Sequence, residues 1–417
     1  MTTGDDIRHE VRSFIEETWD PDMTLRAWWA ALGASGWAFP TWPAEWFGRG
    51  LSREEAGLVG QELSAAGVIG PPEGMAQSMG GPVVLGFGTD EQKRRWLPAI
   101  ATGTEAWCQF FSEPGAGSDL ASVRTRAVKD GDQWVVNGEK VWNSGTLEAD
   151  RGLLVARTDP DQPKHRGLSY FIIEVQQPAI EIRPIRQMNG EAHFNETFFT
   201  DATVADRDLL GGLNNGWAVA LATLTNERTT YAGGGHHVGF RAAPGERAGM
   251  LDLTVGRIVA DQRDAPTQID PFAAAPVHQM VALAREYGRD HDPVLRQRLA
   301  RIYAISEVSR FTALRVQASI QAGRSPGPES SVGYVKGVEM ARLSRDLGLE
   351  ILGPAGMLVG ETAPHGGMVQ HMALTAPCHG IMGGTEQIQK NIIGERLLGL
   401  AKEPQVDRDI PFRALRL

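Results

Sequence analysis

The pattern of hydrophobic and polar positions changes twice along the chain. The first part contains short helical stretches separated by Gly and Pro, as in residues 92–100, where Trp96, Leu97 and Ile100 share one face and charged residues another. Strand-like runs follow, and the helical period then returns. We therefore predict an α+β protein made of an N-terminal helical domain, a middle β domain and a C-terminal helical bundle. The predicted boundaries are 1–107, 108–213 and 214–417.

The middle region contains short runs rich in Val, Ile, Phe and Trp that are bounded by turn signals such as Asp130-Gly131. Strands this close together cannot be joined by crossover helices, so we expect an antiparallel sheet or a small barrel. The predicted strands are 133–137, 153–156, 169–175, 180–185 and 195–200.

The C-terminal region has clear helix starts and ends. Asp292, followed by proline at the first helical position, predicts the start of a helix that closes at Gly323. A second predicted helix ends before Gly353, and a last one spans 386–398. The pattern is poor between residues 243 and 289, and no element is predicted there.

Composition narrows the class of protein. Of the 417 residues, 42% are hydrophobic and 22% are charged, which is typical of a globular chain, and the net charge of -10 disfavours nucleic-acid binding. No stretch approaches the ~18 apolar residues of a membrane span, and the N-terminus has no apolar signal core. We therefore expect a soluble cytoplasmic protein.

Cysteine and histidine give no sign of a metal site. Cys108 and Cys378 are the only cysteines, so no disulfide framework is possible, and neither has the spacing of a metal ligand. His236 and His237 are adjacent, so on regular secondary structure they point in different directions. We predict no metal, and we interpret Cys108 as a core residue.

The most specific motif spans residues 108–119 and reads CQFFSEPGAGSD; residues 131–145 follow with GDQWVVNGEKVWNSG. Gly115 and Gly117 let the backbone approach a bound group, and Ser112 and Ser118 offer hydroxyl groups. A dinucleotide-binding GxGxxG turn is excluded, because Leu120 stands at the sixth position and strands follow.

Both stretches closely resemble the acyl-CoA dehydrogenase family, whose members carry a TEPGAGSD-type loop and then an NGxKxWITN-type strand. The resemblance covers nearly the whole chain and includes the GGTEQIQ…ERLLGL ending at residues 383–400. It implies a helix–sheet–helix fold, FAD as cofactor and an acyl-CoA thioester as substrate.

The resemblance also implies cofactor-binding positions. The loop would lie along the flavin, with Ser112 near its pyrimidine edge and Ser118 reaching toward the CoA part of the substrate. Trp142 would flank the isoalloxazine, and the hydroxyl of Ser144 would stand near flavin N5. Taken alone, each such residue is as well explained by capping or core packing. The full predicted cofactor set is Gln109, Phe111, Ser112, Gly117, Ser118, Trp142, Asn143, Ser144, Thr385 and Gln387.

The catalytic base is not where part of the family has it. In the short- and medium-chain branch a Glu stands directly before Gly-Thr, but Gly383 occupies that position here and cannot take a proton. The isovaleryl- and long-chain-type branch supplies a Glu from a helix after the β domain, directly before an Arg. Glu227 followed by Arg228 matches that pattern, so Glu227 is the predicted base. Arg228 is predicted to organise the site or bind substrate, since guanidinium stays charged.

Other interpretations remain open. Glu227 and Arg228 could be an ordinary solvated pair on a helix. Glu386 is the nearest competitor as base, although a helix would turn it away from position 383. Glu113 belongs to the family loop and is interpreted as structural.

Two departures from the family concern the FAD pyrophosphate. No clear Arg-x-x-Phe-Gly segment is present; residues 285–288 are the closest fragment, with the wrong spacing. Glu350 stands where the family often has Gln, and a carboxylate there would repel the pyrophosphate. FAD would then be bound by other donors or shared with a partner chain.

Three functions therefore compete. The first is a dehydrogenase that passes electrons to an electron-transfer flavoprotein, as a homo-oligomer or an α2β2 hetero-oligomer. The second is a noncatalytic partner subunit, and the third is an oxidase or flavin monooxygenase of the same fold. The missing side chain at Gly383 leaves volume that favours branched, bulky or ring-bearing thioesters.

Overall fold

The computed structural model describes residues 3–232, 240–264, 277–321 and 327–415. Its N-terminal part is helical, and hydroxyl residues begin several of the helices. Thr3, Ser52 and Thr89 each accept a backbone hydrogen bond from the third helical residue and form a capping box. The helices are α1 (Gly4–Thr18), α2 (Leu25–Ala34), α3 (Arg53–Ala65), α4 (Gly81–Phe87) and α5 (Asp90–Ala101).

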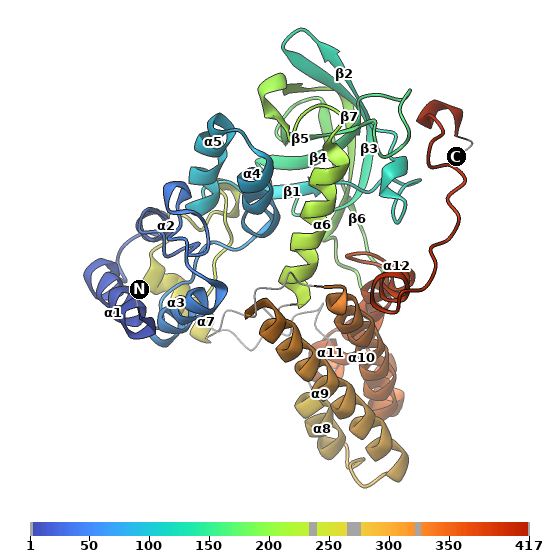
Figure 1. Ribbon diagram of the computed structural model, residues 1–417. Coiled ribbons are helices and arrows are strands. Elements are labelled where there is room, and N and C mark those ends of the chain that lie inside the picture. The colour runs from blue at the N-terminus through green and yellow to red at the C-terminus, as the bar shows by residue number, and fades with distance from the viewer. Residues whose placement is uncertain (1–2, 233–239, 265–276, 322–326, 416–417) are drawn as a thin grey trace.

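A segment distant in the sequence completes this helical core. The backbone N–H of Leu25 donates to Leu253 O at 2.9 Å, and Thr24 pairs with Thr254 as an antiparallel bridge. Helix α7 (Val255–Asp264) follows and packs Val255 and Ile258 into the core of α1–α3. In Figure 1 α7 accordingly lies beside α3, on the side of the molecule that holds the N-terminus. Residues 240–264 therefore pack with the N-terminal helices, although the predicted boundaries placed them in the C-terminal bundle.

The middle region is an eight-stranded sheet with the order β6-β7-β3-β2-β4-β5-β8, with β1 paired to β4. Its pairings are antiparallel except those of β1 and β2 with β4, which are parallel. The predicted strands are confirmed, and β6 has the predicted bounds. The strands are β1 (Trp107–Phe110), β2 (Arg126–Asp130), β3 (Gln133–Ser144), β4 (Arg151–Arg157), β5 (Leu168–Glu174), β6 (Ile180–Ile185), β7 (Phe194–Ala205) and β8 (Leu209–Leu210).

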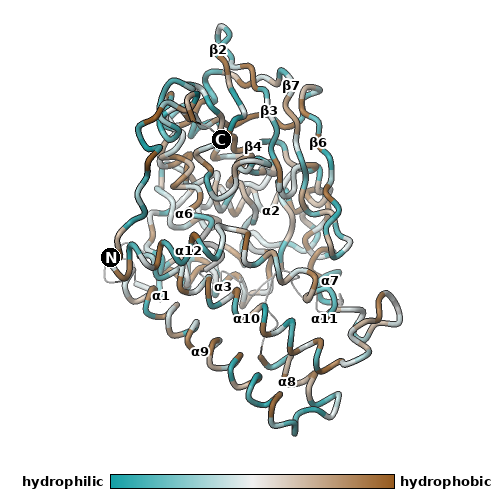
Figure 2. Tube along the Cα trace, turned by 90° about the vertical axis from the view of Figure 1, so that its right-hand side faces the viewer, coloured by the Kyte–Doolittle hydropathy of each residue, from teal (hydrophilic) through white to brown (hydrophobic). Residues whose placement is uncertain are grey.

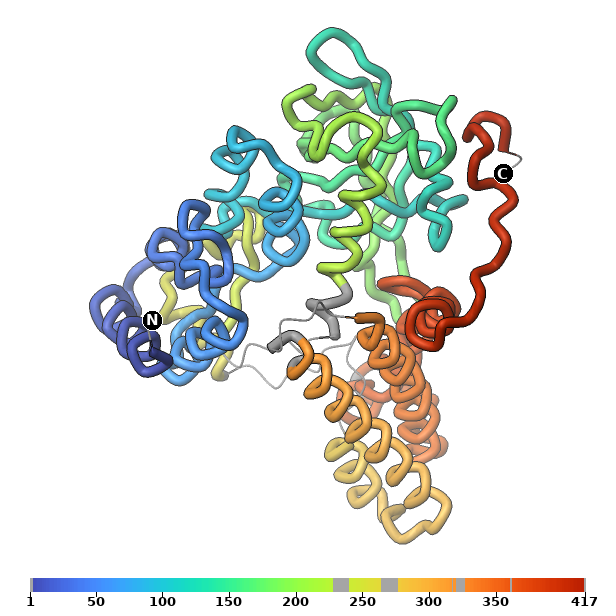
Figure 3. Tube along the Cα trace, viewed as in Figure 1, coloured from blue at the N-terminus to red at the C-terminus, as the bar shows by residue number. Residues whose placement is uncertain are grey.

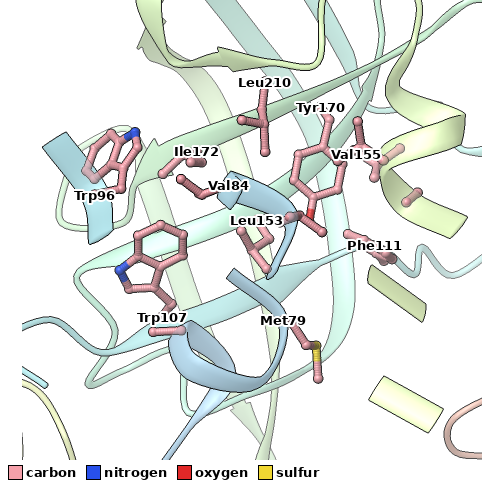
Figure 4. Close-up of a cluster of buried hydrophobic side chains, with 14 of the residues drawn as sticks. Met79, Val84, Trp96, Trp107, Phe111, Leu153, Val155, Tyr170, Ile172 and Leu210 are labelled. Atoms are coloured by element: carbon pink, nitrogen blue, oxygen red, sulfur yellow. The ribbon is translucent and has the colours of Figure 1, made fainter. Parts of the chain in front are cut away.

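The sheet is tied to the helices by a shared hydrophobic core. Trp96 of α5 and Trp107 of β1 are buried edge to face, with ring centroids 5.8 Å apart, beside Leu153 and Ile172 of the sheet (Figure 4). Helix α6 (Gly216–Ala232) crosses this layer, and its start is pressed against the backbone of Ser169. The sheet therefore fixes where α6 begins.

The C-terminal helices project away from the sheet (Figure 1). Asp292 accepts backbone hydrogen bonds from Val294 at 2.9 Å and Leu295 at 3.2 Å, which confirms the predicted helix start. Gly323, its predicted end, lies outside the described residues. The helices are α8 (Val277–Glu286), α9 (Pro293–Gln321), α10 (Glu329–Leu352), α11 (Met368–Thr375) and α12 (Glu386–Ile392).

The predicted last helix is divided. A π-helical turn, Ile393–Leu397, continues α12, and the chain then leaves as an extended tail that returns to the sheet (Figure 3). Hydrophilic and hydrophobic residues alternate along the long helix α9 (Figure 2). Within the described ranges, no helix has both the length and the apolar character needed to cross a membrane.

Candidate active site

The loop after β1 is held by a buried ion pair. Glu113 accepts hydrogen bonds from the backbone N–H groups of Arg124 at 2.6 Å and Thr125 at 2.9 Å, and from Lys140 Nζ at 2.8 Å. Burial acts to raise the pKa of Glu113, but the Lys140 ammonium and these donors hold it below its usual range. These three contacts close the loop onto β3 and onto the residues just before β2, which supports a structural role for Glu113.

Strand β3 lies against the same loop. The N–H of Val141 donates to Ser112 O at 2.9 Å, and Asn143 Nδ2 donates to Gln109 O at 2.8 Å. Asn143 is in turn held from β7, because Asn195 Nδ2 donates to its carbonyl at 3.0 Å. The two motifs found in the sequence are therefore one hydrogen-bonded unit.

Trp142 is the unusual residue of this unit. The register of β3 with β7 shifts between Val141 and Asn143, and Trp142 adopts a left-handed backbone with φ of 64°. Such a conformation is rare for a bulky side chain and is found most often where function requires it. The shift leaves the indole 57% exposed, edge-on to Phe194 at 6.0 Å between ring centroids.

The polar groups here fit a hydrogen-bonding ligand. Gln109 Nε2 and Asn143 Oδ1 are buried without a hydrogen-bond partner among the described residues. Ser112 and Ser144 are half-buried beside them, and Ser118 is exposed. Gly117 has open space where a Cβ would stand, so the backbone can be approached closely.

The side chain of Phe111, unlike these polar groups, does not face a ligand. Its ring is buried in the core, edge-on to Tyr170 with centroids 5.8 Å apart, and its carbonyl accepts from Lys140 at 2.9 Å. Any contact of Phe111 with a cofactor would therefore involve its backbone.

The turn before α12 places a glycine at the centre of the site. Gly383 and Gly384 have φ of 63° and 94°, and the chain then enters α12 with Thr385 as its N-cap, accepting from Ile388 N at 3.2 Å. Gln387 is exposed on the first turn. Gln389 Nε2 donates to Gly383 O at 3.1 Å and so fixes the turn to the helix.

Glu227 reaches this glycine from α6. A Cβ placed on Gly383 would lie 3.9 Å from Glu227 Oε1 and 3.8 Å from Tyr334 Cε2. The carboxylate of Glu227 therefore stands beside the position from which a side chain at 383 would project. The side chain of Arg228 lies outside the described residues.

Tyr334, on α10, is a neighbour that the sequence did not indicate. Its hydroxyl donates to His379 O at 2.6 Å and also contacts Met382 O, so it holds the turn that leads to Gly383. Burial, with the nearby acidic groups of Cys378 and Glu227, raises the pKa of Tyr334 to about 12. Only tertiary packing brings Tyr334 here, and no motif surrounds it in the sequence.

The competing carboxylate is engaged elsewhere. Glu386 forms ion pairs of 2.7 Å with both Lys390 and Arg342. Hydrogen bonds from these two cations lower the pKa of Glu386. Glu350 is likewise paired with Arg298, while Arg289 donates to its carbonyl at 3.2 Å.

Models of known protein families match most of this chain. Three models match in succession: the acyl-CoA dehydrogenase N-terminal domain over residues 3–104, the middle domain over 108–202 and the C-terminal domain over 272–398. The acyl-CoA dehydrogenase IpdE1 of Mycobacterium tuberculosis is 37% identical over 381 residues, covering 91% of this chain and 88% of that protein. The chain belongs to the acyl-CoA dehydrogenase family. The predicted family, fold and enzyme class are thus confirmed, and membership implies FAD.

Further proteins similar to this acyl-CoA dehydrogenase include a second M. tuberculosis protein and two solved structures. FadE34 of M. tuberculosis is 35% identical over 376 residues, which cover 89% of this chain but 46% of that protein. Two similar solved structures are described as the Tcur3481-Tcur3483 steroid ACAD and the ChsE4-ChsE5 complex from M. tuberculosis. The first has 26% identity and a TM-score of 0.69 over 96% of this chain and 98% of that one. The second has 29% identity and a TM-score of 0.67 over the same shares.

Proposed function

We propose that this acyl-CoA dehydrogenase converts an acyl-CoA thioester to the trans-2-enoyl-CoA, with Glu227 as the base that removes the α proton. The observation that carries the proposal is the distance of 3.9 Å between Glu227 Oε1 and the Cβ position of Gly383. In the other branch of the family the base projects from that position. A carboxylate that reaches the same point from α6 can approach the same α carbon.

The reaction requires a carboxylate placed beside the α carbon, in a site that excludes water. The α proton of a thioester is weakly acidic, so a positioned base is needed to remove it. The carboxylates of Glu113 and Glu386 are placed elsewhere, that of Glu113 against Lys140 and that of Glu386 against Arg342 and Lys390. Glu227 is the carboxylate that stands next to the open position.

The described residues fit FAD, which would accept the β hydride at flavin N5 when bound. Gln109, Ser112, Asn143 and Ser144 would supply hydrogen-bonding groups from the loop and β3, and the exposed indole of Trp142 would flank the ring. From α12, Thr385 and Gln387 would approach the cofactor. The backbone of Phe111 and Gly117 completes this proposed set.

The substrate is proposed to be bulky. Gly383 contributes no side chain, and a Cβ placed there would meet its nearest atoms, on Tyr334 and Glu227, at ordinary contact distance. One similar structure is described as a steroid ACAD. We therefore favour branched or ring-bearing thioesters, with Ser118 and Arg228 contacting the substrate.

The proposed electron acceptor is an electron-transfer flavoprotein, and the assembly is a homo-oligomer or an α2β2 hetero-oligomer. The ChsE4-ChsE5 neighbour is described as a complex.

The carboxylate of Glu350 is paired with Arg298, and this pairing lowers the repulsion between Glu350 and the pyrophosphate of FAD.

The test is the visible spectrum of the purified protein with FAD, before and after anaerobic addition of straight-chain, branched and ring-bearing acyl-CoA thioesters. We expect one of the thioesters to bleach the oxidised flavin band of the unaltered protein. The Glu227→Gln variant should still bind FAD but should show no bleaching. Bleaching that survives in Glu227→Gln would refute the base. A protein that binds no FAD alone would favour the noncatalytic partner subunit, and rapid reoxidation by air would favour an oxidase.

A further inference from the structure

The C-terminal tail ends on the loop between β4 and β5. Pro411 pairs with Pro163 as an antiparallel bridge, and the N–H groups of Phe412 and Arg413 donate to Gln162 O at 2.9 Å and Pro160 O at 3.0 Å. Arg413 also forms an ion pair of 2.5 Å with Asp161. Backbone and side-chain contacts together seat the tail in one register. Figure 3 shows it crossing from α12 back to the sheet domain.

Lys164 connects the seated tail to the motif loop. Its Nζ lies 2.6 Å from Asp407 Oδ2 and 2.9 Å from Asp119 Oδ2, and its side chain is 10% exposed. Asp119 also accepts from Ser122 Oγ at 2.5 Å, so its carboxylate is fixed from two sides. Asp119 directly follows Ser118, which is exposed. The tail therefore reaches the end of the SEPGAGSD segment through one lysine.

Arg157 makes a second connection. The guanidinium is buried and donates to Ala121 O at 2.5 Å and Lys164 O at 2.6 Å. Phe412 of the tail covers it, with its ring centroid 3.8 Å from Arg157 Cζ. The tail thus shields the cation that holds both the end of the motif loop and the backbone of Lys164.

The same β4–β5 loop also contacts the helix that carries Glu227. Thr158 Oγ1 donates to Asn214 Oδ1 at 2.7 Å just before α6, and His165 lies edge-on to Trp217 of α6 with centroids 4.8 Å apart. One loop therefore joins the tail, the motif loop and the start of α6.

We propose that tail residues 407–415 act as a strap that positions the Ser118–Asp119 end of the motif loop to bind the CoA part of the substrate, with Asp407 and Phe412 as positioning residues. This rests on the proposed function for the role of Ser118. It adds that CoA affinity depends on a segment at the far end of the chain. Without the strap, Lys164 loses one of its two carboxylates and Arg157 loses its cover, so the loop samples more conformations and binding loses preorganisation.

The experiment measures the dissociation constant of free coenzyme A by calorimetry on the full-length, FAD-loaded protein. We expect Asp407→Asn and Phe412→Ala each to weaken CoA binding about three- to tenfold. Each variant loses one partly exposed contact, the ion pair with Lys164 or the ring over Arg157, and such contacts contribute a factor of this size. Asp409→Asn is the matched control, since Asp409 is an exposed tail carboxylate outside the contacts described above, and its affinity should stay within about twofold of the unaltered protein.

A double-mutant cycle separates positioning from simple stabilisation. Ser118→Ala should weaken CoA binding by itself, and Asp407→Asn should add little in that background, because the strap acts through Ser118. Equal losses in both backgrounds, unchanged affinity in Asp407→Asn and Phe412→Ala, or no measurable CoA binding by the unaltered protein would overturn the proposal. Free coenzyme A carries no acyl group, so this series does not depend on Glu227 as base.

Discussion

Replacing Glu113 with Gln should destabilise the folded protein strongly, while the folded variant should still reduce flavin with the responsive thioester. The variant leaves Lys140, whose side chain is fully buried, without the carboxylate 2.8 Å from its Nζ. Among the described residues, Lys140 Nζ then keeps only uncharged acceptors, the Phe111 carbonyl at 2.9 Å and the amide oxygen of the new side chain. Breaking a buried pair by removing one side costs about 3–5 kcal/mol, because the other charge stays desolvated. That is a large part of a typical folding free energy of about 5–15 kcal/mol.

The assay is urea unfolding followed by tryptophan fluorescence at neutral pH, beside flavin reduction by the responsive thioester. Glu139→Gln is the matched control, at the position directly before Lys140 on β3. Burial and the nearby carboxylate of Glu196 raise the pKa of Glu139, so neutralising this residue removes a repulsion. Its unfolding free energy should change by less than about 1 kcal/mol. Adding Lys140→Met to Glu113→Gln should recover part of the loss, because no unpaired charge then remains.

The pH dependence of stability has a defined sign. The pKa of Glu113 is lower in the folded protein, so its stabilisation is present above the unfolded value of about 4.3 and is lost as pH falls through the folded value. The unfolding free energy of Glu113→Gln should therefore fall less steeply as the pH is lowered through this range. Unchanged stability together with lost flavin reduction would refute the structural role and make Glu113 a participant in the chemistry.

Other residues give further predictions. Trp142→Gly should relieve the strain of a left-handed backbone, worth about 1 kcal/mol, yet weaken FAD binding about tenfold or more in a fluorescence titration, since the exposed indole is lost. Tyr334→Phe removes the hydroxyl that holds the turn before Gly383, and should slow flavin reduction about three- to thirtyfold in stopped-flow traces with FAD affinity unchanged. Because the pKa of Tyr334 is raised to about 12, its contribution to stability is present below pH about 10 and lost as pH rises toward 12, which alkaline unfolding curves of the two proteins would reveal.

The sequence predicted much of the fold because the signals involved are local. The alternating runs and turn residues located the strands, and Asp292 marks a helix start through bonds to residues two or three positions away. Helix α7 was not predicted, because residues 243–289 have little periodicity of their own. It is stabilised by packing Val255 and Ile258 against helices α1–α3, near the start of the chain.

The site was predictable only where a motif encodes it. The SEPGAGSD loop and β3 are adjacent in sequence and in space, so their hydrogen-bonded unit agrees with the motif. The approach of Glu227 to Gly383 followed from family resemblance, since no local pattern joins residues on α6 and on the turn before α12. The contact of Asp407 with Lys164 spans 243 positions and depends on two charges that look like ordinary surface residues in the sequence. Tyr334 was not predicted, because only tertiary packing brings it to the turn before Gly383.

The most direct test of Glu227 as base isolates proton removal from hydride transfer. A 3-thia acyl-CoA, in which sulfur replaces the β carbon, has no β hydride to give, so α-proton exchange with D2O can be followed alone by mass spectrometry. The unaltered enzyme and Glu386→Gln should exchange the α proton, and Glu227→Gln should slow exchange at least about a hundredfold. Exchange that persists in Glu227→Gln, or that is lost in Glu386→Gln while Glu227 is intact, would contradict the account.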